Sequence, residues 1–462
     1  MTQVADDLRE LLGADKVATG ESVLDLHAGD LSYHPRRNPA AVVFPESTAD
    51  VSRVLAWANE RGVPVVPFGA GTSLEGHVIP ADGAVTLDLA RLNRVLEVLP
   101  GDLQARAQPG VLRSELNLAV AEHGLWFTVD PGADASLGGM AATNASGTTT
   151  VRYGGMRANV LALEVVLADG TTIRPGSRSV KTSAGYDLRS LFVGSEGTLG
   201  VITELTLRLH GLPERPVAIR VAFPDVGTAC RAAVALVGAG LTVTRCELLD
   251  EATLRAVNAY KDTSYTEAPS LFVELDGGDE ELGSVREVCA WEGATALEAV
   301  TAAEDRTRLW EARHHAAFAV AAAEPGKRWF ATDVCVPLSV LPDAVEHGRA
   351  CADRRGIPAA VIAHAADGNF HLALMVDPED AGEVGAAQAL YAELVDWALE
   401  RGGTSTGEHG IGLGKLEYLE REHPDLLPYF RAVKDAFDPN GILNPGKVVR
   451  EPWKKAAPPR VQ

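Results

Sequence analysis

Residues 63–76 read Val-Pro-Val-Val-Pro-Phe-Gly-Ala-Gly-Thr-Ser-Leu-Glu-Gly, so that a short apolar strand runs into a tight glycine-rich loop. Small residues let backbone N–H groups approach an anionic phosphate, and hydroxyl groups add further donors. The loop is no P-loop, because no Gly-Lys-Ser/Thr follows it. The usual nicotinamide fingerprint is also missing, since no Gly-x-Gly-x-x-Gly opens a helix after a strand. The stretch therefore indicates a phosphate contact of another kind, or else a plain surface loop.

Three further segments are rich in small residues, namely 130–155, 194–203 and 443–447. Long loops of Gly, Ala, Ser and Thr with little charge do not pack an ordinary core. They suit a backbone that lies against a large planar or phosphorylated ligand. Flexible surface loops are the alternative, but Leu137, Met140 and Leu199 inside these segments argue against free solvation.

Two histidine motifs lie closer to the C-terminus. Residues 363–375 read Ala-His-Ala-Ala-Asp-Gly-Asn-Phe-His-Leu-Ala-Leu-Met, and residues 407–414 read Gly-Glu-His-Gly-Ile-Gly-Leu-Gly. Asp-Gly between apolar runs predicts a two-residue hairpin turn, which would place His364 directly opposite His371. Two imidazoles at that spacing can share a divalent metal ion such as zinc, manganese or iron(II), with Glu408 as the third ligand. His409 would then be a free base, unless the motifs are merely a turn with solvated histidines and a glycine-rich loop.

Taken in order, these motifs resemble those of the vanillyl-alcohol-oxidase-type FAD flavoproteins, from about Val42 to Val448. Within that superfamily the chain is similar to the D-2-hydroxyacid dehydrogenases. The phrases at 309–314, 332–337 and 406–412 are similar to the cytochrome-type D-lactate dehydrogenases in particular. The resemblance implies an α+β fold with three parts: an FAD-binding domain at residues 1–213, a substrate-binding cap domain with an antiparallel sheet and the metal site at 214–429, and a C-terminal segment at 430–462 that returns to the FAD domain.

The resemblance also implies a reaction. A small D-2-hydroxy acid, with D-lactate as the leading candidate, would be oxidised to the 2-oxo acid. Hydride would pass to flavin N5, and electrons would pass on to an external cytochrome, quinone or electron-transfer flavoprotein. His409 would remove the hydroxyl proton, and Arg313 would clamp the substrate carboxylate; without the resemblance, an ion pair of Arg313 with Glu311 would be the simpler reading. Ala331 stands where relatives that oxidise hydroxyglutarate carry a Lys, which disfavours a dicarboxylate.

The FAD is expected to be bound without a covalent link, because His77 lies beyond the loop in which relatives place a flavin-linked His. The residues implied to contact the cofactor come from all four small-residue segments. They are Pro67, Gly69, Ala70, Gly71, Thr72, Ser73, Pro131, Gly132, Ser136, Gly139, Thr143, Ser146, Gly147, Tyr153, Glu196, Gly197, Gly200, Ile202 and Asn444.

Composition narrows the possible partners. The chain has 462 residues and a formal net charge of −21, which disfavours nucleic acid and anionic membranes as partners. Its five cysteines show no Cys-x-x-Cys spacing, so a reducing compartment is indicated. With no signal-peptide pattern and no membrane-spanning apolar run, we expect a cytoplasmic protein. It could lie at a membrane peripherally through the tail that carries Trp453, Lys454 and Lys455.

Hydrophobic periodicity predicts the main elements of the second half. They include a strand at 244–249, one long helix at roughly 304–323, a strand at 330–336 and a helix at 341–355, around an antiparallel sheet covered on one side. Three other functions stay open: a metal-dependent hydrolase that uses His364, His371 and Glu408, a flavin subunit of a glycolate-oxidase-like complex, and a D-2-hydroxyglutarate dehydrogenase.

Overall fold

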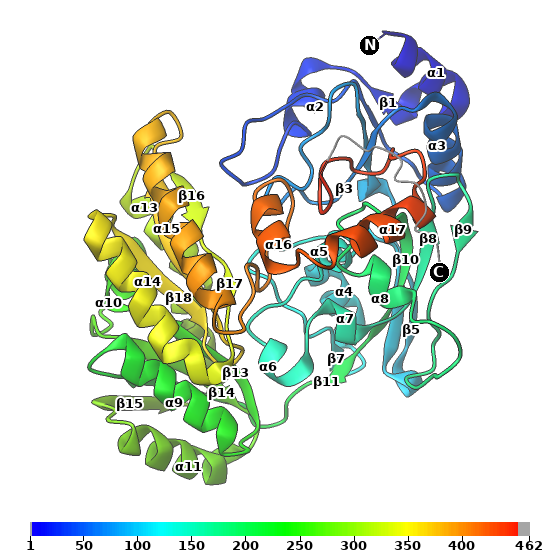
Figure 1. The fold of residues 1–462 in the computed structure, drawn as a ribbon. Helices are drawn as coiled ribbons and strands as arrows, with labels where there is room; N and C mark the ends of the chain where they lie inside the picture. The colour runs from blue at the N-terminus through cyan, green and yellow to red at the C-terminus, as the bar shows by residue number, and fades with distance from the viewer. Residues whose placement is uncertain (1, 451–462) are drawn as a thin grey trace, which may run out of the picture.

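A computed structural model describes residues 2–450 of the chain, arranged as two bodies that meet along one long interface (Figure 1). The tail with Trp453, Lys454 and Lys455 lies outside the described residues. Within residues 2–450, no helix is both long and apolar enough to cross a membrane.

The first body begins with a four-stranded sheet in the order β1-β2-β4-β3. The strands are β1 (Val17–Ala18), β2 (Ala41–Val43), β4 (Val85–Asp88) and β3 (Val65–Phe68). The last three are parallel to one another, as expected of strands joined by a crossover helix. That helix, α3 (Thr48–Arg61), begins at Ser47, whose hydroxyl accepts a hydrogen bond from the Asp50 N–H. It ends at Gly62, which takes the left-handed conformation with φ 64°.

A second, antiparallel sheet of five strands lies beside the first, in the order β5-β6-β10-β8-β9. Its strands are β5 (Val95–Leu99), β6 (Gln104–Ala107), β10 (Val201–Arg208), β8 (Val160–Val166) and β9 (Thr172–Ile173). Helix α5 (Leu137–Thr143) packs on this sheet and buries Leu137 and Met140. The small-residue segment 130–155 is therefore packed, as those apolar side chains predicted. Short elements complete the body: α1 (Thr2–Leu12), α2 (Glu21–Leu26), α4 (Arg113–Ala121), α6 (Thr150–Tyr153), α7 (Met156–Asn159), α8 (Arg189–Phe192), β7 (Leu125–Trp126) and β11 (His210–Gly211).

The second body is built on an eight-stranded antiparallel sheet, in the order β15-β12-β14-β13-β18-β19-β16, with β17 paired to β19. The strands are β12 (Val217–Ala222), β13 (Val243–Leu249), β14 (Ser270–Leu275), β15 (Ala296–Val300), β16 (Arg328–Ala331), β17 (Val334–Cys335), β18 (Ala359–His364) and β19 (Asn369–Val376). The helices are α9 (Val226–Gly238), α10 (Glu251–Lys261), α11 (Gly278–Trp291), α12 (Ala303–His314), α13 (Ala316–Ala323), α14 (Leu341–Arg355) and α15 (Ala381–Leu399).

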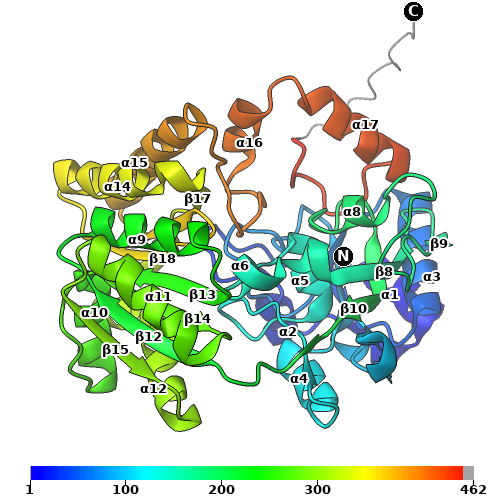
Figure 2. The same cartoon turned by 90° about the horizontal axis from the view of Figure 1, so that it is seen from below.

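The sheet of the second body is covered on both faces, so the expectation of a one-sided cover is wrong. Helices α9, α11, α14 and α15 bury one face around Phe370 and Leu372 (Figure 2). Helices α10, α12 and α13 bury part of the other around Phe272 and Ile362. Strands such as β18 are apolar on both sides, which a continuous hydrophobic run permits and strict alternation would not. The part of the second face that the helices leave open carries His364 and His371.

The histidine hairpin has a different register from the predicted one. His364 pairs with Asn369, and His371 pairs with Ile362. The loop therefore has four residues, Ala365 to Gly368, and not two. The register is shifted by two residues, so every side chain keeps its face. His364 and His371 are diagonal neighbours on one face, with ring centroids 5.8 Å apart.

Two predicted elements are each divided in two. The helix at 304–323 breaks at His315, where φ is −94° and ψ is −1°; there the ring Nδ1 lies 2.9 Å from the Glu311 carbonyl oxygen, which also accepts from the His315 N–H. The strand at 330–336 is interrupted at Thr332 and Asp333, because the side chains of both form buried hydrogen bonds. The second interruption places the Thr332 carbonyl and the Asp333 carboxylate beside His371 and His409.

The C-terminal part of the chain returns to the first body through α16 (Leu416–Glu422) and α17 (Leu427–Phe437) (Figure 1). Val65 forms a parallel bridge with Leu443, and the Asn444 N–H donates to the Val65 carbonyl at 2.8 Å. The domain boundaries at 213/214 and 429/430 themselves stay a prediction.

Candidate active site

A cavity of about 930 Å³ runs between the two bodies. The predicted cofactor contacts line it, with the exception of Tyr153. At one end the lining also includes Arg313, His364, His371, Glu408 and His409. The structure thus brings the small-residue segments and the histidine motifs, which are far apart in sequence, to one cavity, whose rim at Leu31 and Phe318 is exposed.

Two glycines show why small residues occur in the wall. A Cβ atom on Gly69 would lie 2.4 Å from Ser136 Oγ, and one on Gly147 would lie 2.2 Å from the Asp130 carbonyl oxygen. Side chains at these positions would therefore displace the neighbouring loop as well as fill the cavity. Loops packed backbone to backbone around a long cavity fit a bound dinucleotide such as FAD, whose phosphates take main-chain N–H donors.

Three of the predicted cofactor contacts hold the protein together. Tyr153 lies away from the cavity, with its ring 5.6 Å from that of Trp126 and 4.7 Å from that of His210. Glu196 lines the cavity, but its carboxylate accepts hydrogen bonds from the backbone of Ile411 and Gly412. Asn444 donates to the Glu196 carbonyl at 2.7 Å. These last two residues tie the 407–414 loop to the first body.

The three predicted metal ligands converge on one point. Glu408 Oε1 lies 3.2 Å from His364 Nε2 and 3.1 Å from His371 Nε2. The ligand atoms of the three side chains lie within 4.8 Å of one another. Two imidazoles and one carboxylate at this spacing form a ligand set that leaves coordination positions free for a substrate. The donor set therefore fits a divalent cation.

Buried partners orient both imidazoles. His364 Nδ1 lies 2.8 Å from Glu247 Oε1, and His371 Nδ1 lies 2.9 Å from the Thr332 carbonyl oxygen. Each ring is thereby fixed with its Nε2 toward Glu408, as is usual for histidines that ligate metals. The carboxylate of Glu408 also accepts a hydrogen bond from Ser146 Oγ at 3.0 Å.

Two carboxylates, Glu247 and Glu408, face the ring of His364. Burial alone would lower the pKa of His364, but Glu247 and Glu408 outweigh it and raise that pKa well above its usual value. Burial would raise the pKa of Glu408, yet His364 and His371 hold it well below the usual value. A divalent cation would replace the proton that the raised pKa favours on His364, because metal binding to imidazole releases protons.

His409 is held at the edge of the cluster by backbone and by stacking. Its backbone N–H donates to Asp333 Oδ2 at 2.8 Å, and its ring stacks on that of His371. Asp333 is fully buried and also accepts from Lys415 Nζ at 2.9 Å and from Asn369 Nδ2 at 3.0 Å. This carboxylate anchors the loop that carries Glu408 and His409.

Arg313 lines the cavity from α12, and its Nε donates to Glu247 Oε2 at 2.6 Å. Its partner is therefore Glu247 and not the sequence neighbour Glu311. The carboxylate of Glu247 bridges Arg313 and His364, so that one buried residue orients both the predicted clamp and a predicted ligand.

Sequence reasoning missed Glu247, Asp333 and Lys415. Glu247 is a single acid in the apolar strand 243–249, which is a signal that could have drawn attention to it. Asp333 lies inside the 332–337 phrase and Lys415 follows the 407–414 loop, but no spacing rule connects either residue to the histidines.

Comparisons with known proteins identify the family of the chain. Residues 39–176 match the FAD binding domain family, and residues 212–448 match the family of FAD linked oxidases, C-terminal domain. A probable mitochondrial D-lactate dehydrogenase of Danio rerio is 42% identical over 455 residues, which cover 97% of this chain and 92% of the relative. A mitochondrial D-lactate dehydrogenase [cytochrome] of Arabidopsis thaliana is 42% identical over 90% of this chain and 75% of its own. A glycolate oxidase subunit of Bacillus subtilis is 33% identical, over 98% of each chain.

Two solved structures share the fold. The 4-ethylphenol oxidase from Gulosibacter chungangensis superposes with a TM-score of 0.79 at 21% identity, over 97% of each chain. A p-cresol methylhydroxylase superposes with a TM-score of 0.78 at 19% identity, again over 97% of each chain. The resemblance drawn from the motifs and the α+β fold class are confirmed. The chain belongs to the FAD-linked oxidase family of the vanillyl-alcohol-oxidase type and is an FAD-linked oxidoreductase.

Proposed function

We propose that the protein oxidises a small D-2-hydroxy acid, with D-lactate leading, and that it uses FAD and a divalent metal ion for this. The observation that carries the proposal is the convergence of His364, His371 and Glu408 at one end of the glycine-lined cavity. The names of the 42% identical relatives support the substrate class. Membership of the FAD-linked oxidases removes the metal-dependent hydrolase as an alternative.

Each residue at this end of the cavity has a distinct role in the proposal. Arg313 holds the substrate carboxylate in a fork of N–H donors. His364, His371 and Glu408 would hold the cation, which would lower the pKa of a ligated hydroxyl group. His409 takes the hydroxyl proton at a ring nitrogen. Bound FAD would accept the hydride from Cα.

Arg313 and Glu247 already form an ion pair before substrate binds. The substrate carboxylate must bind Arg313 without leaving the Glu247 carboxylate unpaired. Glu247 keeps its second contact, to His364, when Arg313 turns part of its guanidinium toward a carboxylate. A buried charge left alone costs several kcal/mol, roughly 3–5, so this shared arrangement matters. We infer that the pair orients the clamp before substrate arrives.

Several finer points belong to the proposal as well. The electron acceptor would be an external cytochrome, quinone or electron-transfer flavoprotein, and FAD would be bound without a covalent link. A cytoplasmic location stays a prediction, while the two 42% identical relatives are named mitochondrial. The likeness to a glycolate oxidase subunit keeps one alternative open, a flavin subunit active only with partner chains.

Anaerobic mixing with a panel of D- and L-2-hydroxy acids tests the proposal, with flavin bleaching as the readout. We expect D-lactate to bleach the flavin of the isolated chain and L-lactate to leave it oxidised. Bleaching by L-lactate in preference would contradict the substrate hand. Absence of bleaching with every acid would favour the multi-subunit alternative.

A further inference from the structure

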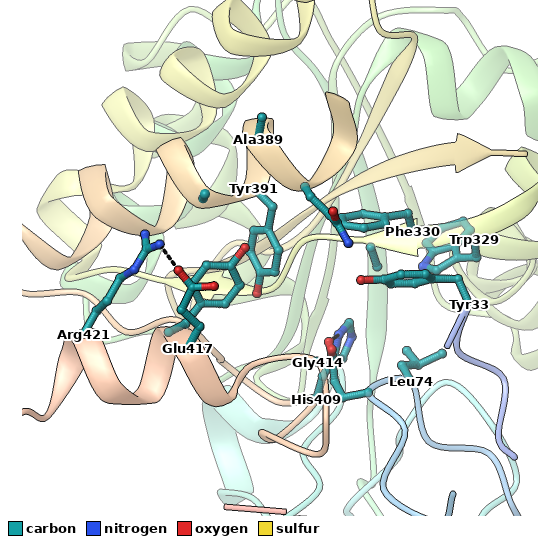
Figure 3. A pocket seen from close by; sticks show the side chains of 15 residues that line it. Tyr33, Leu74, Trp329, Phe330, Ala389, Tyr391, His409, Gly414, Glu417 and Arg421 are labelled. Carbon is teal, nitrogen blue, oxygen red and sulfur yellow. Dashed lines mark hydrogen bonds and ion pairs between the residues drawn. The ribbon is translucent and has the colours of Figure 1, made fainter. Parts of the chain in front are cut away.

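A second cavity, of about 370 Å³, lies beside His409 and is called the side cavity below (Figure 3). It is enclosed by β16, α15, α16 and the segment around Tyr33. The volume corresponds to about a dozen water molecules at roughly 30 Å³ each. Among the described residues, none of the predicted cofactor contacts lines it.

The side cavity shares a wall with the large cavity. Leu74, Trp329, Ala331 and His409 line both. His409 is therefore reached from two directions, and Ala331, which also lines both cavities, has only a methyl group as a side chain. A molecule in the side cavity is one residue away from the convergent histidines.

The other end of the side cavity is at the protein surface. Its lining residues Gln388, Ala389, Glu417 and Arg421 are exposed, whereas Phe330 on the inner part is buried. Figure 3 shows Ala389 on α15 at the opposite side of the cavity from His409. The cavity thus connects solvent with the imidazole.

The wall is mixed in character. Tyr33 stacks on Phe330 with ring centroids 4.9 Å apart, and Glu417 pairs with Arg421 at the surface end. At the inner end, the Glu75 carboxylate lies 3.2 Å from Lys415 Nζ, which it shares with Asp333. Aromatic rings with polar groups at both ends suit the passage of a small polar molecule.

We propose that the side cavity is the passage by which the 2-hydroxy acid reaches His409 and by which the 2-oxo acid leaves. This inference rests on the proposed function. The cofactor must occupy the glycine-lined part of the large cavity, and the side cavity leads to the same end without crossing any of those loops. Ala331 and Trp329 would form the narrow point between passage and site.

The variant Ala389→Trp tests the passage, because it narrows the outer end at an exposed helix position and leaves the site intact. In anaerobic stopped-flow with the FAD- and metal-loaded protein, the second-order rate constant for flavin reduction by D-lactate should fall at least fivefold. The limiting rate at saturating D-lactate should stay unchanged. Ala381→Trp, exposed on the same helix but lining neither cavity, is the matched control.

Ala321→Trp narrows the large cavity from α13, and it tests the alternative that substrate enters through that cavity. If it slows reduction while Ala389→Trp does not, substrate enters there and the proposal is overturned.

A second measurement does not depend on turnover. Diethyl pyrocarbonate modifies accessible imidazoles, and its rate at His409 in the FAD-loaded protein can be followed by peptide mass spectrometry. That rate should fall several-fold in Ala389→Trp and not in Ala381→Trp. Equal rates, or no reaction at His409 in the native protein, would overturn the passage. If the passage holds here but no 2-hydroxy acid reduces the flavin, only the proposed function fails.

Discussion

The imidazole of His409 lies parallel to that of His371, with ring centroids 5.0 Å apart and an interplanar angle of 6°. One ring belongs to the convergent ligand set and the other does not, so a base stands one ring away from the place where a cation would bind. Asp333 sustains this arrangement, because it accepts the His409 backbone N–H and lies 3.8 Å from His371 Nδ1.

Replacing His371 with Ala should remove the metal and nearly all turnover while the flavin stays bound, because the cofactor loops lie in other segments. We expect turnover to fall by about 1,000-fold, equivalent to roughly 4 kcal/mol of transition-state stabilisation. Metal analysis and dye-coupled assays measure both effects. His347→Ala, in a separate His-Cys-Glu cluster, is the control and should keep native activity. A metal-free His371 variant that turns over at the native rate would refute the assignment.

Glu247→Gln should weaken metal binding without changing any ligand. The carboxylate orients His364 and pairs with Arg313, and loss of such a partner typically costs about 10–100-fold in metal affinity. Titration of the metal-free native protein and of the metal-free variant with Mn²⁺ or Zn²⁺ compares their metal affinities. Glu298→Gln, at an exposed position of the edge strand β15, should leave the affinity unchanged. Native affinity in Glu247→Gln would show that Glu247 has no part in orienting the ligand.

Precipitation of the protein with acid should release the flavin into the supernatant. His77 does line the large cavity, but its Nε2 lies 3.4 Å from Glu196, with which it is buried. That contact turns Nε2 toward Glu196, and His77 also lies beyond the 69–73 loop in which, by the sequence resemblance, relatives carry a flavin-linked His. Yellow colour that stays in the washed pellet would contradict this prediction, and His77→Ala would then show whether His77 is the attachment point.

D-lactate should exceed D-2-hydroxyglutarate in kcat/KM, because Ala331 offers no second cationic group at the site. An unpaired carboxylate in a desolvated site costs several kcal/mol, roughly 2–5. Because Lys would pair with the second carboxylate of D-2-hydroxyglutarate, Ala331→Lys should lower the ratio of kcat/KM for D-lactate to that for D-2-hydroxyglutarate by at least tenfold. Ala331→Leu fills the same space without charge and should slow both substrates. If D-2-hydroxyglutarate is the better substrate of the native protein, the monocarboxylate assignment fails.

Asp50 lies far from the active site, and it should make the free energy of unfolding depend on pH. Burial alone would raise its pKa, but hydrogen bonds from Lys16, the Glu46 N–H and Arg53 lower the pKa to about 2, below the usual 3.8. A lowered pKa in the folded state stabilises the protein above the unfolded value, and this stabilisation is lost as the pH falls toward 2. Between pH 5 and pH 2, the free energy of unfolding should therefore fall less in Asp50→Asn than in the native protein. Urea denaturation at each pH measures this; Asp82→Asn, with a side chain 94% exposed, should match the native slope.

The sequence by itself determined the local structure and the kind of chemistry. Helix α3 follows from the Ser47 cap and the Gly62 stop, and strands β8, β10 and β13 follow from apolar runs, because these signals act over a few residues. For the same reason, the glycine-rich loops predicted a large planar or phosphorylated ligand and the His/Glu-His motifs predicted a metal-ligand set, while FAD itself was implied by the resemblance to a family. The face of His364 and His371 was also predictable, since a shift of two residues preserves the alternation of a strand.

Only the tertiary structure decided the hairpin register and the partners of the site. The register is set by the strands on either side, β13 and β16, and not by the Asp-Gly pair alone. Glu247 meets His364 across 117 residues, and Ser146 meets Glu408 across 262. No local sequence pattern reveals such contacts, because they depend on how separate elements pack against one another. The sequence indicated the candidate metal ligands, and the packing of separate elements against one another placed Glu247 and Ser146 beside them.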